Sequence, residues 1–448
     1  MHDLTTGSIT RHLLKTTSFM LVTMVFQTLY FLIDLYWVGR LGKEAVAAVA
    51  IAGNLTFIVL AITQMLAVGT TTVISHAVGN KDHPRAQLVF NQAQVLGVVA
   101  GVLFLTVAMA LRLAYARALS ADEATAGLAA DYLLWYIPAM GLQFAIVAMS
   151  AALRGTGNFK PGMIVQTAAV IINIVLAPIL IFGWGSPRPL GVAGAAIASL
   201  VAVVVGTVWL STYFKGTEAY LHFRRTLWKP QFTLWWQMLR VGLPAGAEFG
   251  LMAVYLFVVY TITRRFGAAA QAGFGIALRI VQAGFMPVVA LGFAVAPVAG
   301  QNFGARQRAR VKGAFRTAAS LAAAVMIALA VVCYIFPEEL IRVFSDDPGV
   351  AAVGAEYFRI VSWSFVASGI IFVSSSMFQA LGNTFPPLIS SFTRILLVTV
   401  PVIVLSRHDD FALRWIWYIS AASIVVQLIM NLVLLQREMR IRMVNYEV

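Results

Sequence analysis

The chain is a succession of long apolar stretches separated by short polar segments. Each stretch holds 18 or more residues with few charges, as expected of a membrane-spanning helix. The first stretch is about 25 residues long. It lacks a cleavage site of the A-x-A type and other spans follow it, so we interpret it as a retained helix and not a signal peptide. The predicted spans cover residues 13–38, 46–77, 88–111, 131–152, 161–182, 190–214, 237–263, 274–300, 313–336, 356–379, 385–405 and 412–436.

An even number of spans places both termini on one side of the membrane. The longest polar segment contains "KGTEAYLHFRRTLWKP" and lies near the midpoint of the chain. We therefore predict an N-terminal lobe over residues 1–214, an inter-lobe linker over 215–236 and a C-terminal lobe over 237–448.

The two halves match each other at a fixed offset of 225 residues. "RLGKEAVAAVAI" from Arg40 matches "RFGAAAQAGFGI" from Arg265, and "RGTGNFKPG" from Arg154 matches "QALGNTFPP" from Gln379. Because each half has six spans, the repeat is parallel, with its axis along the membrane normal. The predicted fold is an all-α integral membrane protein of twelve helices in two six-helix lobes. The residues with the same residue type 225 positions later include Gly42, Gly79, Ser120, Tyr132, Gly157, Asn158 and Pro161.

The composition agrees with a membrane protein. Of 448 residues, 60% are hydrophobic and only 11% are charged, and the mean hydropathy is +0.85. The net charge of +14 does not indicate nucleic acid binding, because the basic residues lie mostly in loops between spans. With a cytoplasmic N-terminus, and with basic residues at the span ends counted with the flanking segments, the inner segments hold 19 Lys and Arg and the outer loops hold 11. This excess predicts that both termini are cytoplasmic.

Motifs of enzymes are missing from the sequence. There is no Gly-rich phosphate loop, no H-E-x-x-H and no serine-nucleophile elbow. The six His are scattered, and Cys333, the single cysteine, lies inside an apolar run, which excludes a disulfide within the chain. We expect neither an enzyme nor a bound cofactor.

Asp34 is the most informative charge, because a charged residue inside a span is rare and costs about 2.5–3.5 kcal/mol on insertion scales. Gln27, Tyr30 and Asp34 are spaced i, i+3 and i+7, so they share one helix face. That face is expected to look into the bundle or a wet cavity. Removal from water favours the neutral form of a carboxyl group. Asp34 is therefore a candidate for binding H⁺ or Na⁺, although a structural, hydrogen-bonded acid is the alternative.

Away from the span ends, three other charged residues fall within spans. Glu248 is either an ion-coupling acid, a shallow acid near the cytoplasmic end, or the ion-pair partner of Arg279 or Arg240. Arg279 is expected to form an ion pair. Arg394 is expected to reach the inner surface with its long side chain.

Neutral polar side chains recur in the first half, and with Asp34 they suggest a polar cavity for substrate. Individually, such side chains more often join helices by hydrogen bonds. In the repeat, Asp34 corresponds to Val259 and Asn173 to Val398. The helical scaffold is therefore duplicated, but the charged residue is not. The neutral candidates are Asn54, Gln64, Gln143 and Asn173.

The chain resembles the multidrug and toxin extrusion (MATE) transporters over nearly its whole length. The similarity rests on "IDLYWVGRLG", "GNKDHPRAQ", "ALRGTGNFKPGM" and "NIVLAPILIFG" in this order. Within the family it looks closest to the branch named for DNA-damage-inducible protein F. The resemblance implies that Asp34 and Asn173 match the acid of the first span and the asparagine of the fifth. It also implies that Glu248 matches the acid of the seventh span.

Two departures from the family pattern reduce the expected ion site. Ala177 precedes Pro178 where many members of that branch have Asp, and residues 357–379 contain no Asp or Glu, so the tenth-span acid of the sodium-coupled branch is absent. With few charged oxygens available for Na⁺, H⁺ is the favoured coupling ion.

The resemblance implies a monomeric antiporter of the bacterial inner membrane. It would export cationic, amphipathic compounds in exchange for H⁺ by alternating access, with membrane lipid and small molecules as its partners. A lipid-linked saccharide flippase of the same superfamily is an alternative, but it would favour a strongly basic cavity. An intramembrane enzyme lacks a catalytic constellation, and a passive channel is disfavoured because only one half carries the acid.

Overall fold

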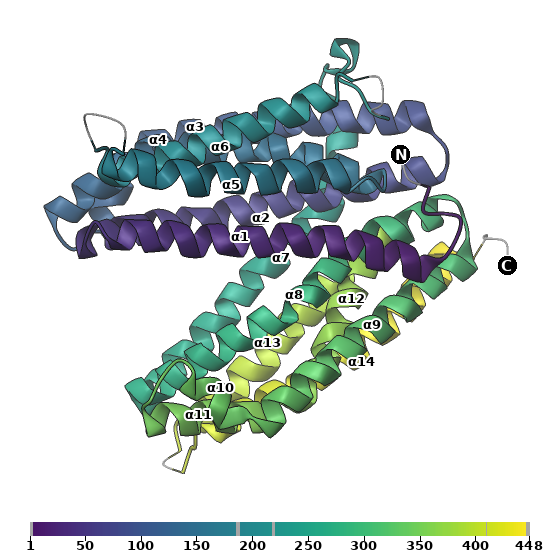
Figure 1. The fold of residues 1–448 in the computed structure, drawn as a ribbon. Helices are drawn as coiled ribbons and strands as arrows, with labels where there is room; N and C mark the ends of the chain where they lie inside the picture. Colours follow the sequence, from purple (N-terminus) through teal and green to yellow (C-terminus); the bar gives the residue numbers. More distant parts are fainter. Residues whose placement is uncertain (1–2, 185–188, 217–219, 409, 445–448) are drawn as a thin grey trace. The chain divides into compact units, whose positions relative to one another are not determined.

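The computed structural model describes residues 3–184, 189–216, 220–408 and 410–444, and this part of the chain contains helices and no strand. Twelve helical spans are long and apolar enough to cross a membrane, which confirms the predicted fold class (Figure 1). The α-helices are α1 (Ile9–Gly39), α2 (Lys43–Gly79), α3 (His83–Leu119), α4 (Glu123–Gly155), α5 (Lys160–Phe182), α6 (Gly191–Tyr213), α7 (Phe232–Thr263), α8 (Ala268–Gly304), α9 (Arg308–Ile335), α10 (Pro337–Arg342), α11 (Pro348–Val361), α12 (Phe365–Leu381), α13 (Phe385–Leu405) and α14 (Arg414–Arg442).

Several helices are longer than the spans predicted for them. The helices α2, α3 and α8 have 37 residues each. At 1.5 Å per residue they measure about 55 Å, against about 30 Å of hydrocarbon. Their ends therefore project beyond the apolar layer. The tenth span is built from α11 and α12, which the 3₁₀ turn Ser362–Ser364 joins.

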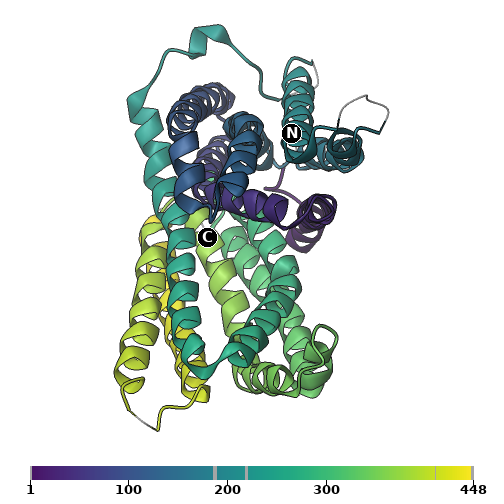
Figure 2. The same ribbon diagram turned by 90° about the vertical axis from the view of Figure 1, so that its left-hand side faces the viewer.

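The chain divides into two compact units. The first contains Ser18–Gly242, and the second contains Leu4–Thr17 and Leu243–Val448. In Figure 2 the helices of the first unit are seen almost end-on and form a bundle. The division differs from the predicted lobes, because Leu4–Thr17, which includes the first residues of α1, packs with the second unit. There the Leu4 amide donates to Gln301 Oε1 (3.1 Å) and Asn302 Nδ2 donates to the Leu4 carbonyl (3.0 Å).

The internal repeat is visible in the backbone of the turns. The amide of Asn158 donates to the carbonyl of Leu153 (3.0 Å), and 225 residues later Asn383 donates to Phe378 at the same distance. Gly157 and Gly382 have φ values of 77° and 75°. Only glycine adopts this left-handed conformation at little cost, which explains the shared Gly-Asn pair at the end of the helix.

Close approach of helix backbones holds the first unit together at α3 and α4. A Cβ atom added to Gly101 of α3 would lie 2.6 Å from the carbonyl oxygen of Gly141 in α4, and one added to Gly97 would lie 3.2 Å from that of Phe144. Small residues four positions apart allow this packing in membrane helices. Larger side chains here would push α3 away from α4.

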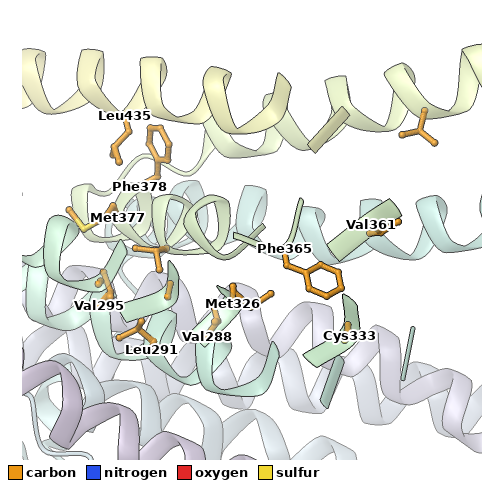
Figure 3. Close-up of a cluster of buried hydrophobic side chains, with 14 of the residues drawn as sticks. Val288, Leu291, Val295, Met326, Cys333, Val361, Phe365, Met377, Phe378 and Leu435 are labelled. Carbon is orange, nitrogen blue, oxygen red and sulfur yellow. The ribbon is translucent and has the colours of Figure 1, made fainter. Parts of the chain in front are cut away.

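The second unit has a continuous apolar core. Figure 3 shows Leu291 of α8, Met326 and Cys333 of α9, Phe378 of α12 and Leu435 of α14 within one cluster of buried side chains. These residues come from four helices, so the core fixes the bundle as a whole. Burial of each large side chain contributes about 1.5–3 kcal/mol where water is the alternative.

The segment between α6 and α7 is ordered by hydrogen bonds to α3 where the structure describes it. Asn91 Oδ1 accepts from Trp228 Nε1 (3.1 Å), and Gln92 Oε1 accepts from the amide of Gln231 (3.0 Å). The segment predicted as a linker is thus bound to the first unit. The three buried amide side chains that hold it are Gln87, Asn91 and Gln92.

Candidate functional site: the acids of the two units

Asp34 lies in the C-terminal half of α1 and is buried, with 9% of its surface exposed. Its Oδ1 atom is buried and accepts no hydrogen bond from any described residue. Buried polar atoms in native proteins almost always have a partner, so such an exception needs a functional or structural reason. An unpaired carboxylate in this position can take up a proton or attract a cation.

A chain of hydrogen bonds links Tyr30 and Asn173 in the first unit. The Tyr30 hydroxyl and Ser199 Oγ lie 2.9 Å apart, and Asn173 Nδ2 donates to the same Ser199 Oγ (3.1 Å). Asn173 and Ser199 are both buried, on α5 and α6. The chain therefore fixes α1 against these two helices one turn away from Asp34.

Aromatic hydroxyls of α4 extend the polar region around Asp34. Tyr132 and Tyr136 lie close enough to Asp34 to experience its charge. Their ring centroids are 4.9 Å apart, and the Tyr136 hydroxyl lies 3.4 Å from Thr56 Oγ1 of α2. The acid is thus surrounded by neutral polar groups and not by basic ones among the described residues.

The other first-half candidates lie in less enclosed positions. Gln27, Asn54 and Gln143 are exposed within the structure, and Gln64 is half-buried. Asn54 lies near the hydroxyl of Tyr115 on α3. The structure thus joins Tyr30 and Asn173 through a shared serine but gives no hydrogen bond between Asp34 and the amides. Their role in substrate binding remains a prediction.

Glu248 lies on α7 in the second unit and is half-buried. Its Oε1 atom accepts hydrogen bonds from Ser391 Oγ on α13 (3.0 Å) and from Ser375 Oγ on α12 (3.4 Å). Gln427 Nε2 of α14 donates to Ser391 Oγ in turn (3.1 Å). Glu248 of α7 is thus bonded directly to α12 and α13, and through Ser391 to α14.

The arginines of the spans do not pair with Glu248. Among the described residues, the ion pairs include neither Glu248 nor Arg279 or Arg240, and Arg279 is exposed. Arg394 places its guanidinium carbon 4.8 Å from the centre of the Tyr255 ring. Contact with an aromatic face is thus the interaction that the structure shows for Arg394, and its expected reach to the inner surface remains a prediction.

Sequence reasoning missed the serines of both sites. Ser199 and Ser391 lie in apolar helices, where a serine hydroxyl commonly bonds to the carbonyl of its own preceding turn. Nothing in the local sequence distinguishes them from other helical serines, and their partners are far away in the chain. In the described part of the chain, no group of three or more His, Cys, Asp or Glu is placed to hold a metal ion.

These observations define a class: a helical membrane protein with an internal repeat and an isolated buried acid in one half. The MatE family matches residues 20–179 and 244–405, one match in each half of the chain. The chain belongs to the MatE family, and it is a membrane transporter and not an enzyme. The family resemblance seen in the motifs is thereby confirmed, whereas the branch within the family remains a prediction.

Relatives and solved structures agree with this assignment. The probable multidrug resistance protein YoeA of Bacillus subtilis is 27% identical over 417 residues, which cover 92% of this chain and 90% of YoeA. The FAD transporter of Shewanella oneidensis is 26% identical over 423 residues, 91% of this chain and 90% of that protein. A crystal structure of MATE in the bent conformation matches with a TM-score of 0.91 at 23% identity, covering 98% of this chain and 97% of that one. The structural match shows the shared fold.

Proposed function

We propose that this protein exports cationic, amphipathic compounds from the cytoplasm in exchange for H⁺ across a bacterial inner membrane. Membership of the MatE family and similarity to a probable multidrug resistance protein support the export of small molecules. In this proposal both termini are cytoplasmic, in line with the excess of Lys and Arg on that side.

The observation that carries the proposal is the buried Oδ1 atom of Asp34, which has no hydrogen-bond partner among the described residues. A carboxylate without a partner in a low-dielectric site interacts strongly with any cation that arrives. Its two natural partners are a cationic substrate and a proton, and the two exclude each other. This competition is the basis of antiport.

The exchange follows from the competition at one carboxyl group. In the ionised state Asp34 attracts the positive charge of the substrate. A proton that enters from the outside binds to the carboxylate oxygen and removes the negative charge, so the substrate loses its partner and leaves outward. The proton later leaves inward, which restores the carboxylate for the next cycle.

The surroundings of Asp34 favour H⁺ over Na⁺. Sodium needs several oxygen ligands, with charged ones among them, whereas Asp34 is accompanied in the first unit by the neutral groups of Tyr30, Asn173 and Ser199. Ala177, where a second acid is expected, is buried with 1% exposure and offers no oxygen from its side chain. A proton needs only the one carboxyl group.

The coupling ion is tested with the purified protein in liposomes that contain a fluorescent cationic dye. We expect dye transport when a pH gradient is imposed and none when an equal Na⁺ gradient is imposed at constant pH. Transport driven by Na⁺ alone would reject H⁺ coupling. Absence of transport under both gradients would reject the antiport.

A second candidate is the export of an anionic dinucleotide, which the similarity to the FAD transporter of Shewanella oneidensis favours. Asp34 argues against it, because a buried carboxylate repels an anionic substrate. The same liposomes loaded with FAD distinguish the two. Release of FAD, with no transport of the dye, would replace the cationic substrate by an anionic one.

A further inference from the structure

A small cavity lies in the first unit where α4 ends, α5 begins and α1 passes. Its volume is about 20 Å³, which is enough for one water-sized group. The polar side chains that line it come from the three helices, and apolar side chains surround them. The polar lining consists of Thr23 of α1, Ser150 and Arg154 of α4 and Gln166 of α5. We call this cavity the Arg154 pocket.

Arg154 has no partner for its charge. Its guanidinium group forms no hydrogen bond or ion pair with any residue that the structure describes, although it is half-buried in the last turn of a membrane helix. Charged groups in such positions normally pair with an acid or with backbone carbonyls. The pocket therefore holds an uncompensated positive charge.

Two further donor groups face the same place. Ser150 is 3% exposed and accepts a hydrogen bond from Gln166 Nε2 (3.2 Å), but its own hydroxyl hydrogen is donated to no described residue. The helix α5 starts here without a side-chain cap. Pro161 has no N–H and the Met163 amide donates to the Phe159 carbonyl (3.1 Å), whereas the amide of Gly162, which lines the pocket, has no acceptor among the described residues. The start of a helix favours an anion. The Ser150 hydroxyl, the Gly162 amide and the Arg154 guanidinium all offer hydrogen atoms and lack an acceptor among the described residues.

At the equivalent turn of the second unit, between α12 and α13, the hydrogen-bond donors are satisfied by side chains of the protein itself. There Gln379 replaces the arginine. Asn383 Oδ1 accepts from the first amide of α13 (3.4 Å), and Asn383 Nδ2 donates to Glu438 (2.9 Å). Glu438 also pairs with Arg442, which donates to the carbonyl of Leu381 (2.9 Å). The turn of the second unit thus includes an acid, Glu438, whereas no acid lines the Arg154 pocket at the equivalent turn of the first unit.

We propose that the Arg154 pocket binds the phosphate group of an anionic phospholipid. The pocket is too small for a drug-sized molecule, but one phosphate oxygen fits it and satisfies the donors together. It lies at the end of α4 that is predicted to face the cytoplasm, where acidic lipids are concentrated and where basic pockets between helices bind their head groups. The apolar lining, which suits the glycerol backbone and acyl chains, includes Phe19, Met20, Leu153, Phe159 and Met163.

The experiment is a titration of the detergent-purified full chain with phosphatidylglycerol, followed by native mass spectrometry, with phosphatidylcholine as the zwitterionic reference. We expect wild-type protein to retain one phosphatidylglycerol per chain. Arg154→Gln should weaken this binding by about tenfold or more, because a charge-assisted hydrogen bond is lost. Ser150→Ala should weaken it less, and Arg154→Lys should retain part of it.

Arg225→Gln is the matched control, since Arg225 is an exposed arginine of the same predicted cytoplasmic side and lies outside the pocket. It should bind phosphatidylglycerol as the wild type does. Equal binding by wild type and Arg154→Gln would overturn the site. If Arg154→Gln does not fold, unchanged affinity in both Ser150→Ala and Arg154→Lys would overturn it instead.

The source of the phosphate is tested in the same titration. Millimolar inorganic phosphate should not displace the lipid, because it lacks the acyl chains that contact the apolar lining. Displacement by inorganic phosphate would replace the lipid by a free phosphate compound as ligand. Retention of phosphatidylcholine as strongly as phosphatidylglycerol would overturn the requirement for a net negative charge.

Discussion

The acids of the two units differ in what surrounds them. In the first unit, Asp34 has a carboxylate oxygen that is buried and accepts no hydrogen bond from described residues. In the second unit, Glu248 accepts hydrogen bonds from the hydroxyls of Ser375 and Ser391. A satisfied carboxylate is held in one state by its partners, whereas an unsatisfied one gains most from a new partner.

The contrast arises on a duplicated scaffold. The turns of the two halves share their backbone conformation, yet the position equivalent to Asp34 is Val259, which is 1% exposed in the apolar core of the second unit. The duplicated turns set the ends of the helices in both units. The chemistry depends on side chains that differ between the units.

Val259→Asp places an acid at the equivalent position of the second unit. The Val259 side chain lies in a well-packed apolar core, so we expect a loss of stability of about 2.5–3.5 kcal/mol. A thermal unfolding scan in detergent measures it, with Val259→Asn as the control of similar shape without the charge. A variant as stable as the wild type would show that the second unit tolerates the acid and that the contrast is not a property of the scaffold.

Ser199→Ala removes the hydroxyl that joins Tyr30 to Asn173. The hydrogen bonds to the two other helices, to Tyr30 and Asn173, are lost at about 0.5–1.5 kcal/mol each, and α1 is held less firmly next to Asp34. Dye export in liposomes should fall by several-fold. Ser211→Ala is the matched control on the same helix, because among the described residues the Ser211 hydroxyl donates only to Met149 Sδ (3.6 Å). Equal export by both variants would separate this hydrogen-bond chain from transport.

Ser391→Ala removes one of the two hydroxyls from Glu248. We expect a cost of about 1 kcal/mol and a change in export of less than about threefold, because Ser375 remains as a donor. Ser390→Ala is the neighbouring control, since its hydroxyl bonds to Asn431 (2.5 Å) and not to Glu248. A loss of export as large as that of an Asp34 variant would make Glu248 an equal partner in coupling.

Asp122→Ala tests a cap that both units share, since Asp122 and Asp347 lie 225 residues apart and begin α4 and α11. The backbone amide of Thr125 donates to Asp122 and lowers the pKa of its carboxyl group. A lowered pKa contributes stability above the unfolded value near pH 4, and the contribution disappears as the pH falls through the folded value.

The measurement is a pair of thermal scans. Asp122→Ala should lower the Tm by about 1–2 °C at pH 7 and leave it unchanged well below pH 3. The same Tm difference at both pH values would show that the cap does not act through its charge.

The sequence predicted the elements whose causes are local. The length of each apolar stretch predicted the spans, and the Gly-Asn pair predicted the turn that separates two of them. In the structure, Gly157 of this turn has the left-handed conformation. Helical spacing placed Tyr30 on the face of Asp34. The bond from Tyr30 to Ser199 was not predictable, because it spans 169 residues and depends on how α6 packs.

The segment between the halves shows the same limit. Its polar composition correctly predicted that it is not a span. Its attachment to α3 depends on amide side chains such as Asn91 and Gln92, more than a hundred residues earlier in the chain. From the sequence alone, a buried amide side chain in an apolar helix is interpreted as a contact between helices. Its hydrogen bonds to the backbone of a distant segment can be identified only in the folded structure.

The most direct test of the central claim compares Asp34→Asn with Asp131→Asn in liposomes under an imposed pH gradient. Asp131 is an exposed acid of the same unit, so the control removes an equal charge without touching the buried site. We predict that Asp34→Asn folds, with a Tm near that of the wild type, and loses dye export, whereas Asp131→Asn retains it. Export at the wild-type rate by Asp34→Asn would contradict the assignment of Asp34 as the coupling carboxylate.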